Sequence, residues 1–197
     1  MVSLTKKERE ALLVLFKDFT AYYNANSLSK VLGISHVGCQ KILKRLLKGN
    51  LVNAENIGKS IVYKPRLEDE YVCRLLAFLL ADEANNSFKR WQEEFKSLFK
   101  KDRIIMLFGS VLKNAQTAKD IDIMIILSKE DSREVRKVIK EKQEILPKKI
   151  HLIELTEQDL KSNINKKQEV ILGIIRNAVI LYGQDKYVEV MQHVAGF

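Results

Sequence analysis

The chain has 197 residues, 46% of them hydrophobic and 30% charged, a composition that excludes general disorder and fits one or two globular domains. Its 8 glycines and 2 prolines exclude a collagen-like or proline-rich chain. Its longest stretch without Lys, Arg, Asp or Glu is residues 19–29, whereas a membrane-spanning helix needs about 18 or more apolar residues. The opening MVSLTKKERE lacks the apolar core of a signal peptide, and two cysteines make neither a disulfide framework nor a metal-ligand pattern. We therefore expect a soluble, cytoplasmic protein that does not bind membranes.

Positive charge is concentrated near the start of the chain. The formal net charge is +9, and residues 1–65 contain 11 Lys and Arg against 4 Asp and Glu. Such an excess favours a polyanionic partner, although charged residues also serve simply to solvate a surface.

Three short helices are predicted in the first 50 residues. Thr5 and Glu8 have the spacing of a capping box, so the first helix is expected to run to about residue 18. The second is expected over residues 27–32, with Ser27 as its N-cap. The positions expected to face inward on the three helices are Leu12, Leu13, Leu15, Phe16, Leu28, Val31, Leu32, Val37, Ile42, Leu43, Leu46 and Leu47.

A sharp turn and a hairpin complete this region. Gly33 tolerates the positive φ of a tight turn, and Ser35 is placed to cap the third helix, which is expected to end at Gly49 and Asn50. The β-prone residues 51–53 and 60–63 then predict a hairpin with a basic tip.

The segment LSKVLGISHVGCQKILKRLLKGNLV resembles the winged helix-turn-helix family of DNA-binding domains. The resemblance implies double-stranded DNA as the partner, with the third helix in the major groove and the hairpin against phosphates. The residues that would face bases are Ser35, His36, Gly38, Gln40 and Lys41. Those that would face the DNA backbone are Lys44, Arg45 and Lys59. The alternative is a protein-interaction or dimerisation module with a solvated basic face.

Two further helices are predicted between residues 68 and 100. Their apolar positions recur at helical spacing, with an interruption at Asn85-Asn86-Ser87: they are Tyr71, Leu75, Phe78, Leu79, Phe88, Trp91, Phe95, Leu98 and Phe99. We expect these helices to join two domains and to carry a homodimer contact, with Trp91 in a core or subunit contact.

The segment RIIMLFGSVLKNAQTAKDIDIMIIL contains the residues with the clearest chemical signature. Residues 104–108 read as a buried strand that ends at Gly109 and Ser110, and a second buried strand begins at Asp120 and Asp122. Side chains alternate along a strand, so both carboxylates face the same way. A divalent cation would offset the cost of placing two carboxylates together, and Mg²⁺ combines one or two carboxylates with water and substrate phosphates.

This arrangement resembles the minimal nucleotidyltransferases of the polymerase-β-like superfamily, over about residues 103–183. Gly109, Ser110, Asp120 and Asp122 match that family's motif, and Lys113 falls where the family often has Arg or Lys. The resemblance implies a short helix after Ser110 and a closing helix that ends at residues 179–183. It also implies Mg²⁺ or Mn²⁺ held by Asp120 and Asp122, and a nucleoside triphosphate contacted by Gly109, Ser110 and Lys113. The family's chemistry is transfer of a nucleoside monophosphate to an acceptor hydroxyl.

The family's third carboxylate has no clean match in this chain. It sits on a third strand, here expected at residues 149–155, where His151 fills the usual position. Glu154 is near, but its opposite strand parity turns it away unless the strand bulges. His151 is either a base that prepares the acceptor hydroxyl or a packed residue. A helix over residues 132–145 is expected before this strand. A final helix is expected to bury Val170, Leu172, Ile174 and Ile175.

Together these observations predict an α+β chain with a small mixed sheet flanked by helices in its C-terminal part. The expected divisions are a winged helix at residues 1–66, connecting helices at 67–100 and a nucleotidyltransferase-like domain at 101–197. The first functional hypothesis is a DNA-binding nucleotidyltransferase. The second is a transcription regulator whose degenerate transferase domain serves as a nucleotide sensor or interaction module. A third, weaker hypothesis is an antitoxin-like partner of a separate helical toxin.

Overall fold

The computed structural model describes residues 3–194, which form two compact units, one ending at Leu79 and the other running from Leu80 to Val194. The predicted domain boundaries at residues 66 and 100 stay predictions, and the outer ends of the predicted domains, residues 1–2 and 195–197, lie outside the described part. Within residues 3–194, no helix is both long and apolar enough to cross a membrane.

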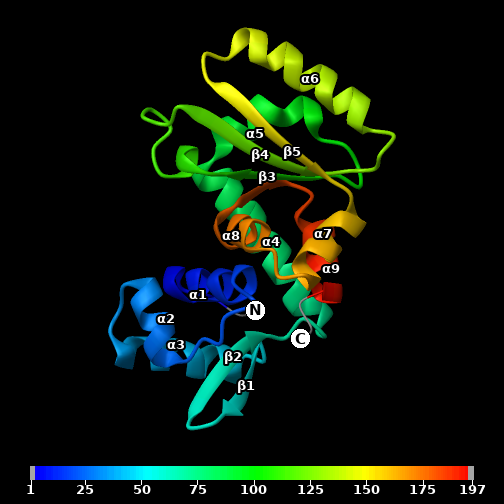
Figure 1. Cartoon of the computed structure of the whole chain (residues 1–197). Coiled ribbons are helices and arrows are strands. Elements are labelled where there is room, and N and C mark those ends of the chain that lie inside the picture. The colour runs from blue at the N-terminus through cyan, green and yellow to red at the C-terminus, as the bar shows by residue number, and fades with distance from the viewer. Residues whose placement is uncertain (1–2, 195–197) are drawn as a thin grey trace. The chain divides into compact units, whose positions relative to one another are not determined.

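The first unit has the element order of a winged helix-turn-helix, three helices followed by an antiparallel hairpin. The elements, shown in blue to cyan in Figure 1, are α1 (Lys6–Lys17), α2 (Ala25–Leu32), α3 (His36–Lys48), β1 (Val52–Ile57) and β2 (Ser60–Pro65). The capping box of Thr5 and Glu8 is confirmed. The predicted cap of the second helix is wrong, because Asn24 is the N-cap of α2. Ser27 is the third residue of the helix and the partner of Asn24 in a capping box.

The turn between α2 and α3 is as predicted. Gly33 ends α2 with a left-handed φ of 63°, and the Ser35 side chain accepts a hydrogen bond from the Gly38 N–H at 3.1 Å. Three residues predicted to face inward are exposed instead: Val31, Val37 and Leu47. Helical spacing identifies an apolar face but not its width, and α3 buries only Cys39, Leu43 and Leu46.

The helices that follow differ from the prediction at their junction. Helix α4 (Glu70–Ser87) continues through Asn85 and Asn86. It is separated from α5 (Lys89–Phe95) by the single non-helical residue Phe88. The Asn86 side chain donates a hydrogen bond to Asp82 one turn earlier, which stabilises the last turn of α4. Two of the periodic apolar positions of α4, Tyr71 and Phe78, are exposed.

The second unit contains a four-stranded mixed sheet in the order β5-β4-β3-β6. Its strands are β3 (Ile104–Phe108), β4 (Asp120–Ile126), β5 (Lys149–Leu155) and β6 (Val179–Tyr182). Strands β4 and β5 are parallel, whereas the other pairs are antiparallel. The helix predicted over residues 132–145 is confirmed as α6 (Ser132–Ile145). The closing helix predicted to reach residues 179–183 is wrong there, because β6 occupies this segment beside β3.

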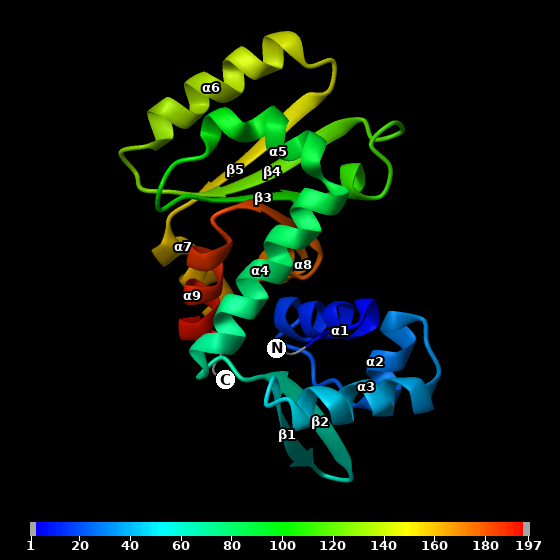
Figure 2. The same ribbon diagram turned by 180° about the vertical axis from the view of Figure 1, so that it is seen from behind.

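Helices cover both faces of this sheet (Figures 1 and 2). Helices α5 and α6 lie on one face, and α7 (Glu157–Asn165), α8 (Glu169–Asn177) and α9 (Gln184–Val194) lie on the other. Of the residues predicted to be buried in α8, Val170 is exposed, whereas Leu172, Ile174 and Ile175 are buried.

One hydrophobic cluster fills the space between the sheet and α5 and α6. On β4 it takes every second residue, Ile121, Ile123 and Ile125, and it includes Trp91 of α5 and Val135 of α6. The intervening residues of β4 point to the opposite face of the sheet. The start of β4 therefore offers Asp120 and Asp122 to that other face without disturbing the cluster.

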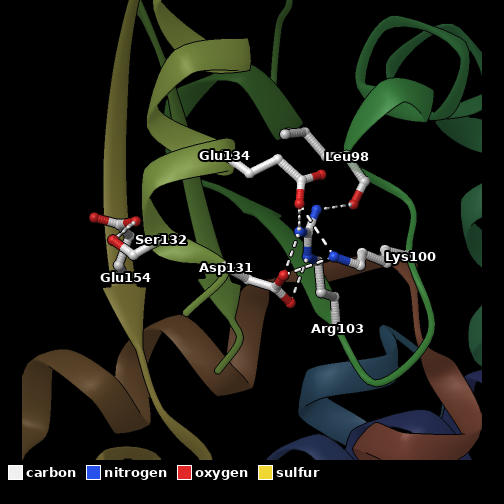
Figure 3. Close-up of polar contacts among 7 residues, drawn as sticks. All are labelled: Leu98, Lys100, Arg103, Asp131, Ser132, Glu134 and Glu154. Carbon is white, nitrogen blue, oxygen red and sulfur yellow. Dashed lines mark hydrogen bonds and ion pairs between the residues drawn. The ribbon is translucent and has the colours of Figure 1, made fainter. Parts of the chain in front are cut away.

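A buried arginine links the start of β3 to the start of α6 through ion pairs (Figure 3). Arg103 is 1% exposed, and its guanidinium donates to the Leu98 carbonyl at 3.2 Å and forms ion pairs with Asp131 at 3.1 Å and Glu134 at 2.8 Å. Lys100 pairs with the same two carboxylates. Hydrogen bonds from Lys100 and then from Arg103 hold the pKa of both carboxyls below their usual range.

Candidate functional site

Three potential metal ligands converge at the beginning of β4 and β5. The parallel pairing places His151 directly beside Asp122. The His151 Nδ1 lies 3.2 Å from Asp122 Oδ1 and 3.6 Å from Asp120 Oδ2, and one ligand atom from each of the three residues lies within 4.8 Å of the others. Their side chains are 21–45% exposed, so the cluster is partly enclosed and still open to a soluble ligand. Carboxylate oxygens with an imidazole nitrogen form a donor set suited to a divalent cation.

Gly109 brings the loop after β3 against this cluster. Its φ is 79°, and a Cβ on this residue would collide with the Asp122 carboxylate. Only glycine therefore fits here, both for its backbone conformation and for the close approach of Asp122. After Gly109, Ser110–Leu112 form a single 3₁₀ turn, where a short helix was predicted.

A cavity of about 630 Å³ opens beside Gly109. The predicted nucleotide-binding residues Ser110 and Lys113 line it together with Gly109. Its opposite wall is α8, with Glu169, Gly173, Ile174 and Asn177. A volume of this size is typical of small-molecule sites.

The α8 residues of this wall were missed in the sequence. Glu169, Gly173 and Asn177 follow one another at four-residue intervals, so they share one helix face, and none of the three carries an apolar side chain. That spacing was the available signal.

Glu154 is not brought to the cluster. It pairs with Ile125, a core-facing residue of β4, and its carboxylate therefore lies on the α6 side of the sheet. There it accepts a hydrogen bond from Ser132 at 2.8 Å, visible in Figure 3, and pairs with Arg136 at 2.6 Å. Strand β5 does not bulge, so the parity argument against Glu154 holds and His151 is the third group at the cluster.

The predicted DNA-facing residues of the first unit fall into two groups. His36, Gln40 and Lys44 follow one another at four-residue intervals on α3 and, with Lys59 of the hairpin, line a concavity of about 360 Å³. Asn24 and Asn26, at the start of α2, also line it and were missed in the sequence. Asn24 is the N-cap of α2, and its side chain accepts hydrogen bonds from the N–H groups of Asn26 and Ser27.

The other predicted residues have different surroundings. The hydroxyl of Ser35 caps α3. Lys41 is exposed outside the lining of the concavity. Arg45 forms an ion pair at 3.0 Å with Glu8, whose side chain is 1% exposed, so part of its role is to compensate a buried carboxylate.

Comparison with known proteins supports the assignment of the second unit. Residues 93–186 match the protein family described as Polymerase beta, Nucleotidyltransferase, and this range includes the convergent cluster and the cavity. No curated protein matches the chain. Among solved structures, the chain is similar to a zinc-responsive MarR family member, ZitR from Lactococcus lactis, with 14% identity, a TM-score of 0.37, and coverage of 73% of this chain and 76% of that one.

Proposed function

We propose that the second unit binds a nucleoside triphosphate together with a divalent cation and transfers the nucleoside monophosphate to an acceptor hydroxyl. The observation that carries this proposal is the convergence of Asp120 and Asp122 beside the cavity formed by Gly109 and Ser110. The match of residues 93–186 to the nucleotidyltransferase family supports the same chemistry.

Each side chain of the site has a distinct proposed role. Asp120 and Asp122 hold the cation, which when bound would offset the negative charge that develops on the phosphates during transfer. The hydroxyl and N–H of Ser110 and the ammonium of Lys113 contact the phosphates, because they line the same cavity. His151, whose Nδ1 lies 3.2 Å from Asp122 Oδ1, stands beside the cation site where the resemblance puts a third carboxylate. Glu169 and Asn177 of α8 offer hydrogen-bonding groups to the rest of the nucleotide.

The binding step is tested by calorimetry with ATP, with and without Mg²⁺. We expect binding that depends on Mg²⁺ and that falls at least tenfold in Asp122→Asn, because the variant removes one negative ligand from the cation. Asp185→Asn, the same change on α9, is the matched control and should bind as the wild type does. Equal binding by Asp122→Asn and the wild type would contradict the assignment.

The transfer step is tested with ATP labelled at the α-phosphate, Mg²⁺ and candidate acceptors. We expect slow transfer of label that disappears in the double variant Asp120→Asn/Asp122→Asn. General-base assistance is worth roughly 10²–10⁴-fold, so His151→Asp should raise the rate while His151→Ala leaves nucleotide binding nearly unchanged. Bound nucleotide without any transfer, in the wild type and in His151→Asp, would favour the nucleotide sensor, a reading that the histidine at the third position supports.

We also propose that the first unit binds duplex DNA through the concavity lined by His36, Gln40, Lys44 and Lys59. Lysines on two different elements line one surface, and their positive charge favours binding to a phosphate backbone. The amide of Gln40 and the imidazole of His36 supply groups that can hydrogen-bond to base edges.

A further inference from the structure

We propose that His151 is a third protein ligand of the cation site and directs it toward a transition-metal ion of the Fe²⁺ to Zn²⁺ group in preference to Mg²⁺. The inference rests on the cation site of the proposed function and specifies which class of ion that site takes. Its basis is the position of the imidazole among the two carboxylates.

The separations between donor atoms fit direct coordination by the imidazole. Ligand atoms bound tetrahedrally at 2.0–2.1 Å are about 3.3 Å apart. The His151 Nδ1 lies 3.2 Å from Asp122 Oδ1 and 3.6 Å from Asp120 Oδ2, on either side of that value. One ion can therefore contact all three residues after only small adjustments of their side chains.

The backbone fixes the imidazole in this place. Asp122 and His151 are direct partners in the parallel pairing of β4 and β5, so no loop needs to move for both to reach one ion. The opposite side of Asp122 is closed by Gly109, which leaves the carboxylate facing the histidine. His193, by contrast, bonds through its Nδ1 to the Glu189 carbonyl of its own helix.

The donor set selects the class of ion. Mg²⁺ is a hard ion that takes oxygen ligands and retains several waters, and an imidazole nitrogen adds little to its binding. Ions from Fe²⁺ to Zn²⁺ bind imidazole well, and affinity for nitrogen-containing sites rises along that series. Two carboxylates and one imidazole also leave coordination positions for phosphate oxygens, as a nucleotide site requires.

A histidine that competes with the metal ion would affect metal binding in the opposite direction from a histidine that is a ligand. If the imidazole pairs with the carboxylates in place of a cation, it competes with every metal ion, and its removal strengthens binding of Mg²⁺ and Co²⁺ alike. If it is a ligand, its removal weakens Co²⁺ binding selectively. The dependence of each ion on His151 therefore separates the two roles.

The experiment titrates the full-length protein, without nucleotide, with Co²⁺ and separately with Mg²⁺, by calorimetry and by the visible absorption of bound Co²⁺. We expect His151→Ala to lower Co²⁺ affinity by about tenfold or more and to change Mg²⁺ affinity by less than about threefold. His151→Asp should shift the ratio of the two affinities toward Mg²⁺. The Co²⁺ spectrum of His151→Ala should also change, because a nitrogen ligand is replaced by water.

Two controls keep the result specific. His193→Ala removes a histidine on α9 and should leave both titrations unchanged. Asp122→Asn should weaken both ions, and circular dichroism checks that each variant is folded. Co²⁺ affinity of His151→Ala within about threefold of the wild type, or a gain in Mg²⁺ affinity, would overturn the inference. If Asp122→Asn weakens both ions in that case, the cation site of the proposed function stands and only the ligand role of His151 is lost. If neither ion responds to Asp122→Asn, both fail.

Discussion

At the residue scale, Gly109 affects both the backbone conformation and the position of a site residue. It has a φ of 79° and lies against the Asp122 carboxylate. An alanine would meet two separate penalties. The backbone, with φ 79° and ψ −159°, lies in a region essentially restricted to glycine, which costs a residue with a Cβ roughly 1–3 kcal/mol, and the collision would displace Asp122 as well. The first penalty acts on stability, whereas the second acts on the cation site.

Gly58→Ala separates these two penalties from each other. Gly58 has a φ of 57° in the turn between β1 and β2, and a Cβ there would meet nothing within 4 Å. We expect Gly58→Ala to lower the free energy of unfolding by about 1 kcal/mol without affecting nucleotide binding. Gly109→Ala should lower stability by more and reduce Mg²⁺–ATP affinity at least tenfold, measured by urea unfolding and calorimetry. Wild-type affinity in Gly109→Ala would show that Asp122 does not hold the cation.

At the element scale, the cluster of Arg103, Lys100, Asp131 and Glu134 determines how α6 begins relative to β3. Its carboxylates lie at the N-terminus of α6, where the helix dipole also favours negative charge. Both carboxyls have a pKa in the folded protein below that of the unfolded chain. Their contribution to stability is therefore present above the unfolded pKa of about 4 and is lost as pH falls through the folded pKa values.

The lowered pKa values of Asp131 and Glu134 predict that the second unit is less stable at acid pH. Trp91, the single tryptophan, is packed in its core, so its fluorescence reports unfolding of this unit. We expect the urea concentration at the unfolding midpoint to decrease as the pH is lowered from 7 to 3. In Asp131→Asn/Glu134→Gln the midpoint should be lower at pH 7 and should change less with pH. Exposed Glu141→Gln and Glu144→Gln on the same helix are the matched controls. An unchanged pH dependence in the double variant would mean that other carboxyls dominate acid unfolding.

Which elements could be predicted depended on whether local signals decided them. The apolar runs of β3 and β4 and the cap at Thr5 could be predicted because each is specified by neighbouring residues. Strand β6 was not, since a short apolar run after a helix becomes a strand only through its pairing with β3. The shared orientation of Asp120 and Asp122 could be predicted from the alternation of side chains along a strand. The partnership of Asp122 with His151 needed the register of β4 and β5, which sequence spacing does not determine.

At the scale of the whole molecule, the net charge of +9 is concentrated in the unit with the basic concavity. Each phosphate contact contributes about 0.9 to the slope of log K against log[salt]. We expect Lys44→Ala/Lys59→Ala to weaken duplex binding for all sequences and to reduce that slope by nearly 2, measured by fluorescence anisotropy over a salt series. Arg45→Ala should change the slope less, because Arg45 already pairs with Glu8.

The control for this prediction removes equal charge elsewhere. Lys137 and Lys140 are exposed on α6 in the second unit, and their double alanine variant has the same net charge as Lys44→Ala/Lys59→Ala. It should retain nearly the wild-type slope. An equal reduction of the slope in the two double variants would indicate attraction by net charge alone. If the wild-type protein binds no duplex even at low salt, the first unit is an interaction module.

The alternation along β4 has a consequence for how such a protein diverges. Odd-numbered residues from 121 to 125 build the core, while Asp120 and Asp122 supply the site, so selection can act on the two sets separately. A change of side chain at one set therefore need not disturb the fold that the other set maintains. Substitution of Asp120 or Asp122 would therefore alter the proposed cation site while the packing of Ile121, Ile123 and Ile125 is retained.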